Sequence, residues 1–185
     1  MESIIKKRHL ILISLILLLI SGVALVTYAR QVWQSTENTT FDTTIGDIAG
    51  VKFINGDSIN VNNLGPVLDY HDGANVEFAI FNRTSGNINV SVNLTITNIS
   101  TNLKSSDFKW MLEKLNSSNV YETIASGDFS SFVVGNNSII SNNTIGHGYA
   151  YYKLYIYIDG SVSNNSNLMS NSLVSTVVIN AVEVS

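Results

Sequence analysis

Residues 88–97 alternate strictly between apolar and polar side chains, and a chain with this pattern has few folds open to it. A period of two predicts a β-strand with one buried face, because successive side chains of a strand point to opposite sides. The apolar positions are Ile88, Val90, Val92, Leu94 and Ile96. The polar positions are Asn89, Ser91, Asn93, Thr95 and Thr97. Asn is unfavourable in strands because its amide competes for backbone hydrogen bonds, so this polar face needs an explanation.

Similar patterns recur from residue 50 to the end of the chain. One predicted strand, residues 149–158, has an apolar face of Ala150, Tyr152, Leu154, Ile156 and Ile158. Its other face consists of Tyr149, Tyr151, Lys153, Tyr155 and Tyr157. Further strands are predicted over residues 76–81, 119–125, 129–134, 138–145 and 173–184. Short strands separated by turns, with hardly a helix, predict an all-β fold: a single β-sandwich of the jelly-roll-like kind.

Three segments have less regular patterns. Residues 107–115 alternate like a strand but are also compatible with a short helix. Within residues 50–61, the pair Asn55-Gly56 is the sequence signal of a two-residue hairpin turn. Residues 65–76 read as a loop.

Composition excludes several classes of protein. Charged residues make up 13% of the 185 residues and the net charge is −4, which argues against a nucleic-acid partner. There is no Cys, so the core must hold the fold without disulfides.

The first 29 residues predict export from the cytoplasm. Three basic residues, Lys6, Lys7 and Arg8, precede an uncharged, mostly apolar run over residues 10–29. The basic cluster should stay inside and send the following chain outside. The length of the run fits either a signal peptide cleaved after Ala29 or a retained membrane anchor, and cleavage is the preferred interpretation. A pilin-like leader is less favoured, because His9 stands at the junction where Gly is usual.

The exported part divides into two regions. Residues 30–48 are polar and Thr-rich, with too few apolar residues to form a core strand alone. Residues 49–185 are predicted to form the β-sandwich domain.

Asn-X-Ser/Thr triplets supply the explanation for the Asn-rich face. Nine occur, where composition alone would give about five of this glycosylation motif. We predict N-linked glycans at Asn38, Asn82, Asn89, Asn93, Asn98, Asn116, Asn136, Asn142 and Asn164. The alternative is that Asn and Ser simply solvate an exposed face of a protein with few charges.

Candidate catalytic residues are few. Asp69, His71 and Asp72 stand together on one short segment, but three ligands without a fourth are a weak metal signal. We therefore expect no enzyme activity, no cofactor and no metal, and keep a hydrolase that uses these three residues as a minor alternative. The Tyr-rich face of residues 149–157 is compatible with a carbohydrate or protein contact, or with cross-strand Tyr packing.

The order of these features resembles the TasA/camelysin group of secreted proteins and the related archaeal bundling pili and surface threads. The matching positions are Thr27–Ala29, Ser35, Thr44–Ile48 and Phe78–Gly86. The resemblance implies a jelly-roll subunit that polymerises by donor-strand complementation, in which the N-terminal segment of one subunit fills a groove in the next. Metalloprotease activity, which has been ascribed to some members, is not carried over, because this sequence has no convincing metal site.

We therefore expect an extracellular, N-glycosylated filament subunit whose partners are copies of itself. Residues 30–46 would be the donor strand, with Trp33, Phe41 and Ile45 as subunit contacts, because a β-prone but polar segment suits addition to a neighbour's sheet edge. The alternative is a β-sandwich binding module held at the cell surface by residues 10–29 and associated with the surface layer or the motility machinery. Residues 30–46 would then be a linker, or would pair within their own sheet.

Overall fold

The computed structural model describes residues 42–45, 48–162 and 165–184. These belong to the second of two compact units of the chain, Thr39–Ser185. The predicted leader, the proposed contacts Trp33 and Phe41, and the sequons Asn38 and Asn164 lie outside the described residues. Within the described part, no helix is long and apolar enough to cross a membrane.

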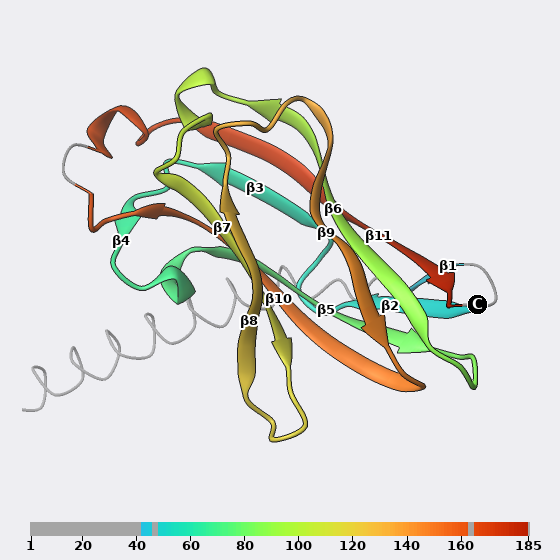
Figure 1. The fold of residues 1–185 in the computed structure, drawn as a ribbon. Helices are drawn as coiled ribbons and strands as arrows, with labels where there is room; N and C mark the ends of the chain where they lie inside the picture. The colour runs from blue at the N-terminus through green and yellow to red at the C-terminus, as the bar shows by residue number, and fades with distance from the viewer. Residues whose placement is uncertain (1–41, 46–47, 163–164, 185) are drawn as a thin grey trace, which may run out of the picture. The chain divides into compact units, whose positions relative to one another are not determined.

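Sheet A is the larger of two sheets, and its strand order is β1-β2-β5-β10-β7-β8 (Figure 1). Neighbouring strands are antiparallel, except that the short β4 pairs in parallel with the end of β10. Its strands are β1 (Asp42–Ile45), β2 (Ala49–Phe53), β4 (Pro66–Val67), β5 (Ala74–Asn82), β7 (Phe108–Leu115), β8 (Tyr121–Asp128) and β10 (Gly148–Asp159).

Sheet B has the order β3-β11-β6-β9, and all its neighbours are antiparallel. Its strands are β3 (Ser58–Asn62), β6 (Ile88–Ile99), β9 (Gly135–Ile145) and β11 (Ser172–Glu183). Three short 3-10 helices connect the strands: η1 (Tyr70–Asp72), η2 (Thr101–Leu103) and η3 (Asn165–Asn167).

The core lies between the two sheets and contains the apolar faces that the sequence predicts. In β6 the apolar positions from Ile88 to Leu94 have no exposed surface, as expected from the period of two. In β10 the face that begins at Ala150 points inward, and Tyr152 stacks on Phe78 with ring centroids 5.2 Å apart. The predicted all-β, single β-sandwich fold is therefore confirmed.

The hairpin predicted at Asn55-Gly56 is wrong, because β2 and β3 belong to different sheets. The Asn55 side chain accepts a hydrogen bond from the Glu77 backbone N–H at 2.7 Å and donates one to the Asn75 side chain at 2.9 Å. These bonds hold the end of β2 against β5. Gly56 then adopts a φ of 94°, a conformation that favours glycine, and the chain crosses to sheet B.

Two other segments for which the sequence predicts a strand can be compared with the structure. Within residues 107–115, strand β7 covers Phe108–Leu115, so the helical alternative is wrong. Residues 129–134, predicted as a strand, form a turn before β9 instead. Phe129 and Phe132 of this turn are buried and pack edge to face, which explains why the segment looked like a strand in the sequence.

Candidate functional site

Strand β11 is longer than its partner β3, and the difference leaves part of β11 without a neighbour. The pairing of β3 with β11 ends at Ser58 and Thr176, and the backbone N–H of Val177 donates to Asp57 O at 2.7 Å. Beyond this point β11 runs on to Glu183, paired with β6 on its other side. We call residues 178–183 the open edge of β11.

The backbone groups at the open edge can be assigned from the alternation of a strand. Because the N–H of Val177 points toward β3, those of Ile179 and Ala181 point to the same side. The N–H of Val184 donates to Asn87 O on the β6 side, as the alternation requires. Within the described residues, no strand pairs with Ile179 or Ala181 on the β3 side.

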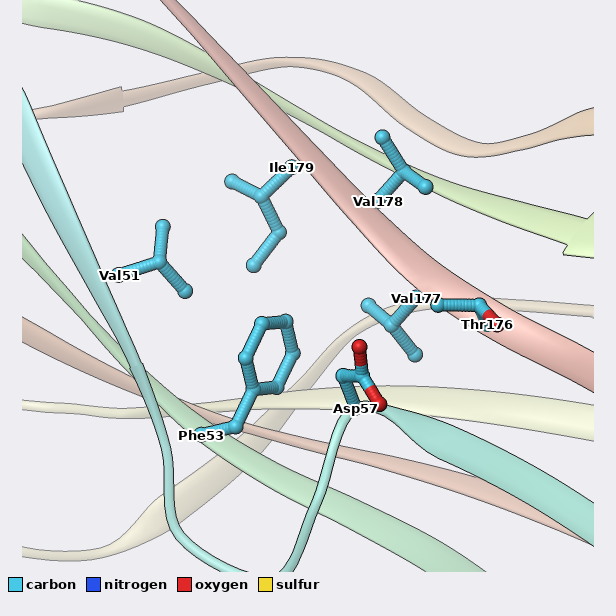
Figure 2. A pocket seen from close by; sticks show the side chains of 7 residues that line it. All are labelled: Val51, Phe53, Asp57, Thr176, Val177, Val178 and Ile179. Carbon is cyan, nitrogen blue, oxygen red and sulfur yellow. The ribbon is translucent and has the colours of Figure 1, made fainter. Parts of the chain in front are cut away.

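An apolar groove of about 210 Å³ lies beside the open edge. Its lining consists of Val51 and Phe53 from β2, Asp57, and residues 176–179 of β11. Figure 2 shows the side chains of Val51, Phe53 and Ile179 converging between the two strands. Four successive residues of β11 line this β2–β11 groove, so it borders the edge of the strand as well as its inner face.

The described end of the predicted donor segment pairs within its own chain. Strand β1 is antiparallel to β2, with Ile45 opposite Ala49 and Asp42 opposite Lys52, and it also lies near β11. Ile45, one of the three proposed subunit contacts, is therefore part of sheet A. Its role in subunit contact stays a prediction.

The predicted glycosylation sites differ in exposure. Asn98, Asn136 and Asn142 are exposed, and Asn89 and Asn116 are half-buried. Asn93 points to the outer face of sheet B as predicted, yet it is only 8% exposed. Its cross-strand neighbours are Val178 and Ser138, which flank it in the middle of the sheet. A glycan on Asn93 would have to displace these neighbours in the folded domain, and its occupancy stays a prediction.

Asn82, another predicted glycosylation site, has a fully buried side chain, and its occupancy likewise stays a prediction. Its amide donates to Gly86 O at 2.8 Å, and its carbonyl oxygen accepts from the backbone N–H and the hydroxyl of Thr84, both at 2.9 Å. The side chain thus organises the turn between β5 and β6. A glycan on Asn82 would replace one of the two amide hydrogens, which donate to Gly86 O and Ile145 O.

The Asp69–Asp72 segment folds as η1 on the outer face of sheet A. His71 Nδ1 lies 2.6 Å from Asp69 Oδ1, and His71 Nε2 lies 3.5 Å from Glu113 Oε1. Hydrogen bonds from the backbone and ring of His71 lower the pKa of Asp69. Asp72 makes no side-chain bond to this cluster within the described set, and no three His, Asp or Glu side chains there are placed to hold a metal.

Glu113 is the residue of this cluster that sequence reasoning missed. It lies on the polar side of β7, where a solvated carboxylate would be expected. In the structure Tyr70 and His71 cover it, and it is 3% exposed.

The Tyr-rich face of β10 is only partly covered by η1. Tyr155 packs against the rings of Tyr70 and His71, and it is 6% exposed. Tyr151 and Tyr149, nearer the start of the strand, are 38% and 63% exposed. The same face therefore has a packed half and an uncovered half.

These features define a β-sandwich with an open edge strand on one side and uncovered aromatic rings on a sheet face. No family model matches the sequence, and no curated protein matches it. Among solved structures, Xyl-CBM35 in complex with a glucuronic acid-containing disaccharide is 14% identical, with a TM-score of 0.36, over 78% of this chain and 99% of that one. The xylan-binding module CBM15 is 13% identical, with a TM-score of 0.32, over 80% of this chain and 99% of that one. Likeness at this level concerns architecture alone, which supports many unrelated functions.

Proposed function

We propose that this protein is a structural subunit of an extracellular, N-glycosylated filament that assembles by donor-strand complementation. Residues 30–46 of one copy would add to the open edge of β11 in the next copy. The observation that carries the proposal is that no described strand pairs with Ile179 or Ala181 on the β3 side, and that the apolar β2–β11 groove lies beside them. An unpaired strand edge is a ready template for another chain.

Strand addition would pair the backbone groups of the open edge and fill the apolar groove. A donor backbone would pair with Ile179 and Ala181, and alternate donor side chains would enter the groove between Phe53 and Ile179. Burying one large apolar side chain contributes about 1.5–3 kcal/mol. Trp33, Phe41 and Ile45 are the large apolar residues that the donor segment offers.

The geometry of this contact explains why a fibre would result. The donor segment and the acceptor edge are different surfaces of the same chain, so the contact is head-to-tail and each copy leaves a free donor and a free acceptor. Cleavage after Ala29 would release the donor segment from the membrane. Strand β1 has only four residues, so exchanging its pairing with β2 for pairing with a neighbour sacrifices few hydrogen bonds.

A proline at the open edge tests the proposal. Ala181→Pro removes an N–H that points away from β6, so the monomer should keep its fold, since proline is tolerated at strand edges. We expect Ala181→Pro to abolish filaments in electron micrographs of cell-surface preparations. Ala181→Ser, which keeps the N–H, should assemble like the wild type. Normal filaments from a correctly folded Ala181→Pro variant would refute addition at this edge.

The second candidate is the binding module retained at the cell surface by residues 10–29. The uncovered half of the Tyr-rich face favours it, because exposed aromatic rings are common at binding surfaces. In this case Ala181→Pro would leave surface display and function unchanged, and the leader would remain attached to the mature protein.

A further inference from the structure

Three aromatic side chains lie side by side on the outer face of sheet A: Phe81, Tyr149 and Tyr151, which we call the aromatic row. Phe81 and Tyr149 are directly opposite each other on β5 and β10, with ring centroids 4.6 Å apart. Tyr151 follows on β10 with its ring centroid 6.0 Å from that of Tyr149 and an interplanar angle of 22°. The row therefore spans two central, adjacent strands.

The rings of the row are held in place although Tyr149 and Tyr151 are exposed and Phe81 is half-buried. Contacts between neighbouring rings restrict their rotation, and His147 adds a further ring contact to Phe81 at 6.2 Å. His147 is itself fixed through its Nδ1, which lies 2.8 Å from Thr84 O. A ligand would thus meet a preorganised surface and would lose little free energy in ordering it.

Polar groups border the row on the same face. Lys153 follows Tyr151 on β10, and its Nζ lies 2.7 Å from Glu77 Oε1 and 4.8 Å from the centroid of the Tyr121 ring. This pair supplies hydrogen-bond donors and acceptors while its two charges cancel. On this side of the row, the surface therefore combines apolar rings with an ion-paired lysine and glutamate.

We propose that the aromatic row binds a carbohydrate chain, independently of the filament assembly proposed above. A sugar ring has an apolar face of C–H groups and a rim of hydroxyls. The C–H groups would pack against the exposed parts of the Tyr149 and Tyr151 rings. Lys153 and Glu77 would form hydrogen bonds with the hydroxyls.

Other ligand classes fit the row less well. A nucleic acid requires a positive surface, whereas Lys153 is neutralised by Glu77 and the chain has a net charge of −4. A stable protein interface buries about 800 Å² on each partner. The row is narrow for that, because the same face is already covered by Tyr70 and His71 at Tyr155. A chain of sugar rings matches a short row of aromatic rings.

The test compares native-gel mobility of the secreted protein with and without soluble polysaccharide in the gel. The probes are neutral mannan, xylan and hydroxyethyl cellulose, and a second arm uses glycopeptides prepared from the protein itself. We expect at least one probe to bind the wild type. The double variant Tyr149→Ala/Tyr151→Ala should bind that probe about tenfold more weakly or worse.

Two controls separate stacking from loss of structure. Tyr149→Phe/Tyr151→Phe keeps the ring faces and should retain binding within a few-fold. Leu68→Ala, which truncates an exposed apolar residue outside the row, should bind like the wild type. Binding by polysaccharides alone would identify an external ligand, and binding by the glycopeptides would identify the glycans of a second copy. Absence of binding to every probe, or binding that survives the double Ala substitution in a folded variant, would overturn the proposal.

Discussion

Tyr70 donates its hydroxyl hydrogen to the Glu113 carboxylate at 2.7 Å, joining η1 to the outer face of sheet A across 43 residues of sequence. Glu113 is 3% exposed, so this bond offsets the loss of water around a buried charge. The same bond raises the pKa of Tyr70. The packed half of the Tyr-rich face therefore depends on a carboxylate that the strand pattern alone would place in solvent.

Removing this hydroxyl should destabilise the domain. We expect Tyr70→Phe to lower the free energy of unfolding by about 1–3 kcal/mol, because it leaves a buried carboxylate short of a donor. Urea denaturation at pH 7 measures the effect. Tyr149→Phe, which changes an exposed ring, is the control and should be nearly neutral. Equal stability of the two variants would show that the Tyr70–Glu113 bond contributes nothing.

Asp159 should make the stability depend on pH in the acid range. Hydrogen bonds from Lys109 and then from Ser161 lower the pKa of this carboxyl from 3.8 to about 2. A depressed pKa gives stability that is present above about pH 4 and is lost as the pH falls toward 2. Because both partners are partly exposed, solvent screening should keep the contribution to about 1 kcal/mol.

Comparing Asp159→Asn with the wild type isolates the contribution of the Asp159 carboxylate to the free energy of unfolding. The difference in the free energy of unfolding should be largest at neutral pH and should shrink between pH 4 and pH 2. Lys109→Met removes the first partner at 2.6 Å and should reduce the same pH dependence. A difference that stays constant across this range would rule out the ionisation of Asp159 as its cause.

Gly127 should not tolerate a larger side chain, because it lies opposite Trp110 in the pairing of β7 with β8. A Cβ at position 127 would come within 2.7 Å of the indole Cζ2 atom. We expect Gly127→Ala to cost about 1–3 kcal/mol through overpacking, measured by thermal or urea unfolding. Gly86→Ala is the control, since a Cβ there meets no atom within 4 Å. A neutral Gly127→Ala would mean that the indole moves aside freely.

Glycan occupancy should follow exposure. We expect mass spectrometry of peptides from the native protein to find glycans at Asn98, Asn136 and Asn142, whose side chains are exposed. Asn82 should be unmodified, because its side chain is fully buried and its amide donates to Gly86 O and Ile145 O. A glycan on Asn82 in folded protein would contradict the assigned role of its side chain.

The period of two predicted the strand faces well, because burying one face of a sheet requires an apolar residue at every second position. The inner faces of β6 and β10 are as expected, down to Tyr152, which is 1% exposed. It was harder to predict which sheet the chain enters after a turn. Asn55-Gly56 resembles a hairpin locally, yet the path of the chain is set by bonds from Asn55 to Asn75 and Glu77 on another strand.

The sites depended on distant parts of the chain and were predicted less completely. An Asn-X-Thr triplet at Asn82 is both a glycosylation motif and a turn signal, and only the burial decides between them. Its Gly86, two residues beyond Thr84, was the available hint of a turn. The open edge of β11 exists because β3 has five residues and β11 has twelve. The pattern of residues 173–184 does not indicate how long the partner strand is.

The state of the N-terminus in native material tests filament assembly most directly. Intact mass and N-terminal sequencing should be carried out separately on assemblies sheared from the cell surface and on membranes. Assembly by residues 30–46 predicts large sheared assemblies whose chains start at or near Arg30 and carry extra mass in hexose-sized steps. An intact leader, found only in the membrane fraction, would contradict donor-strand assembly and leave the anchored binding module.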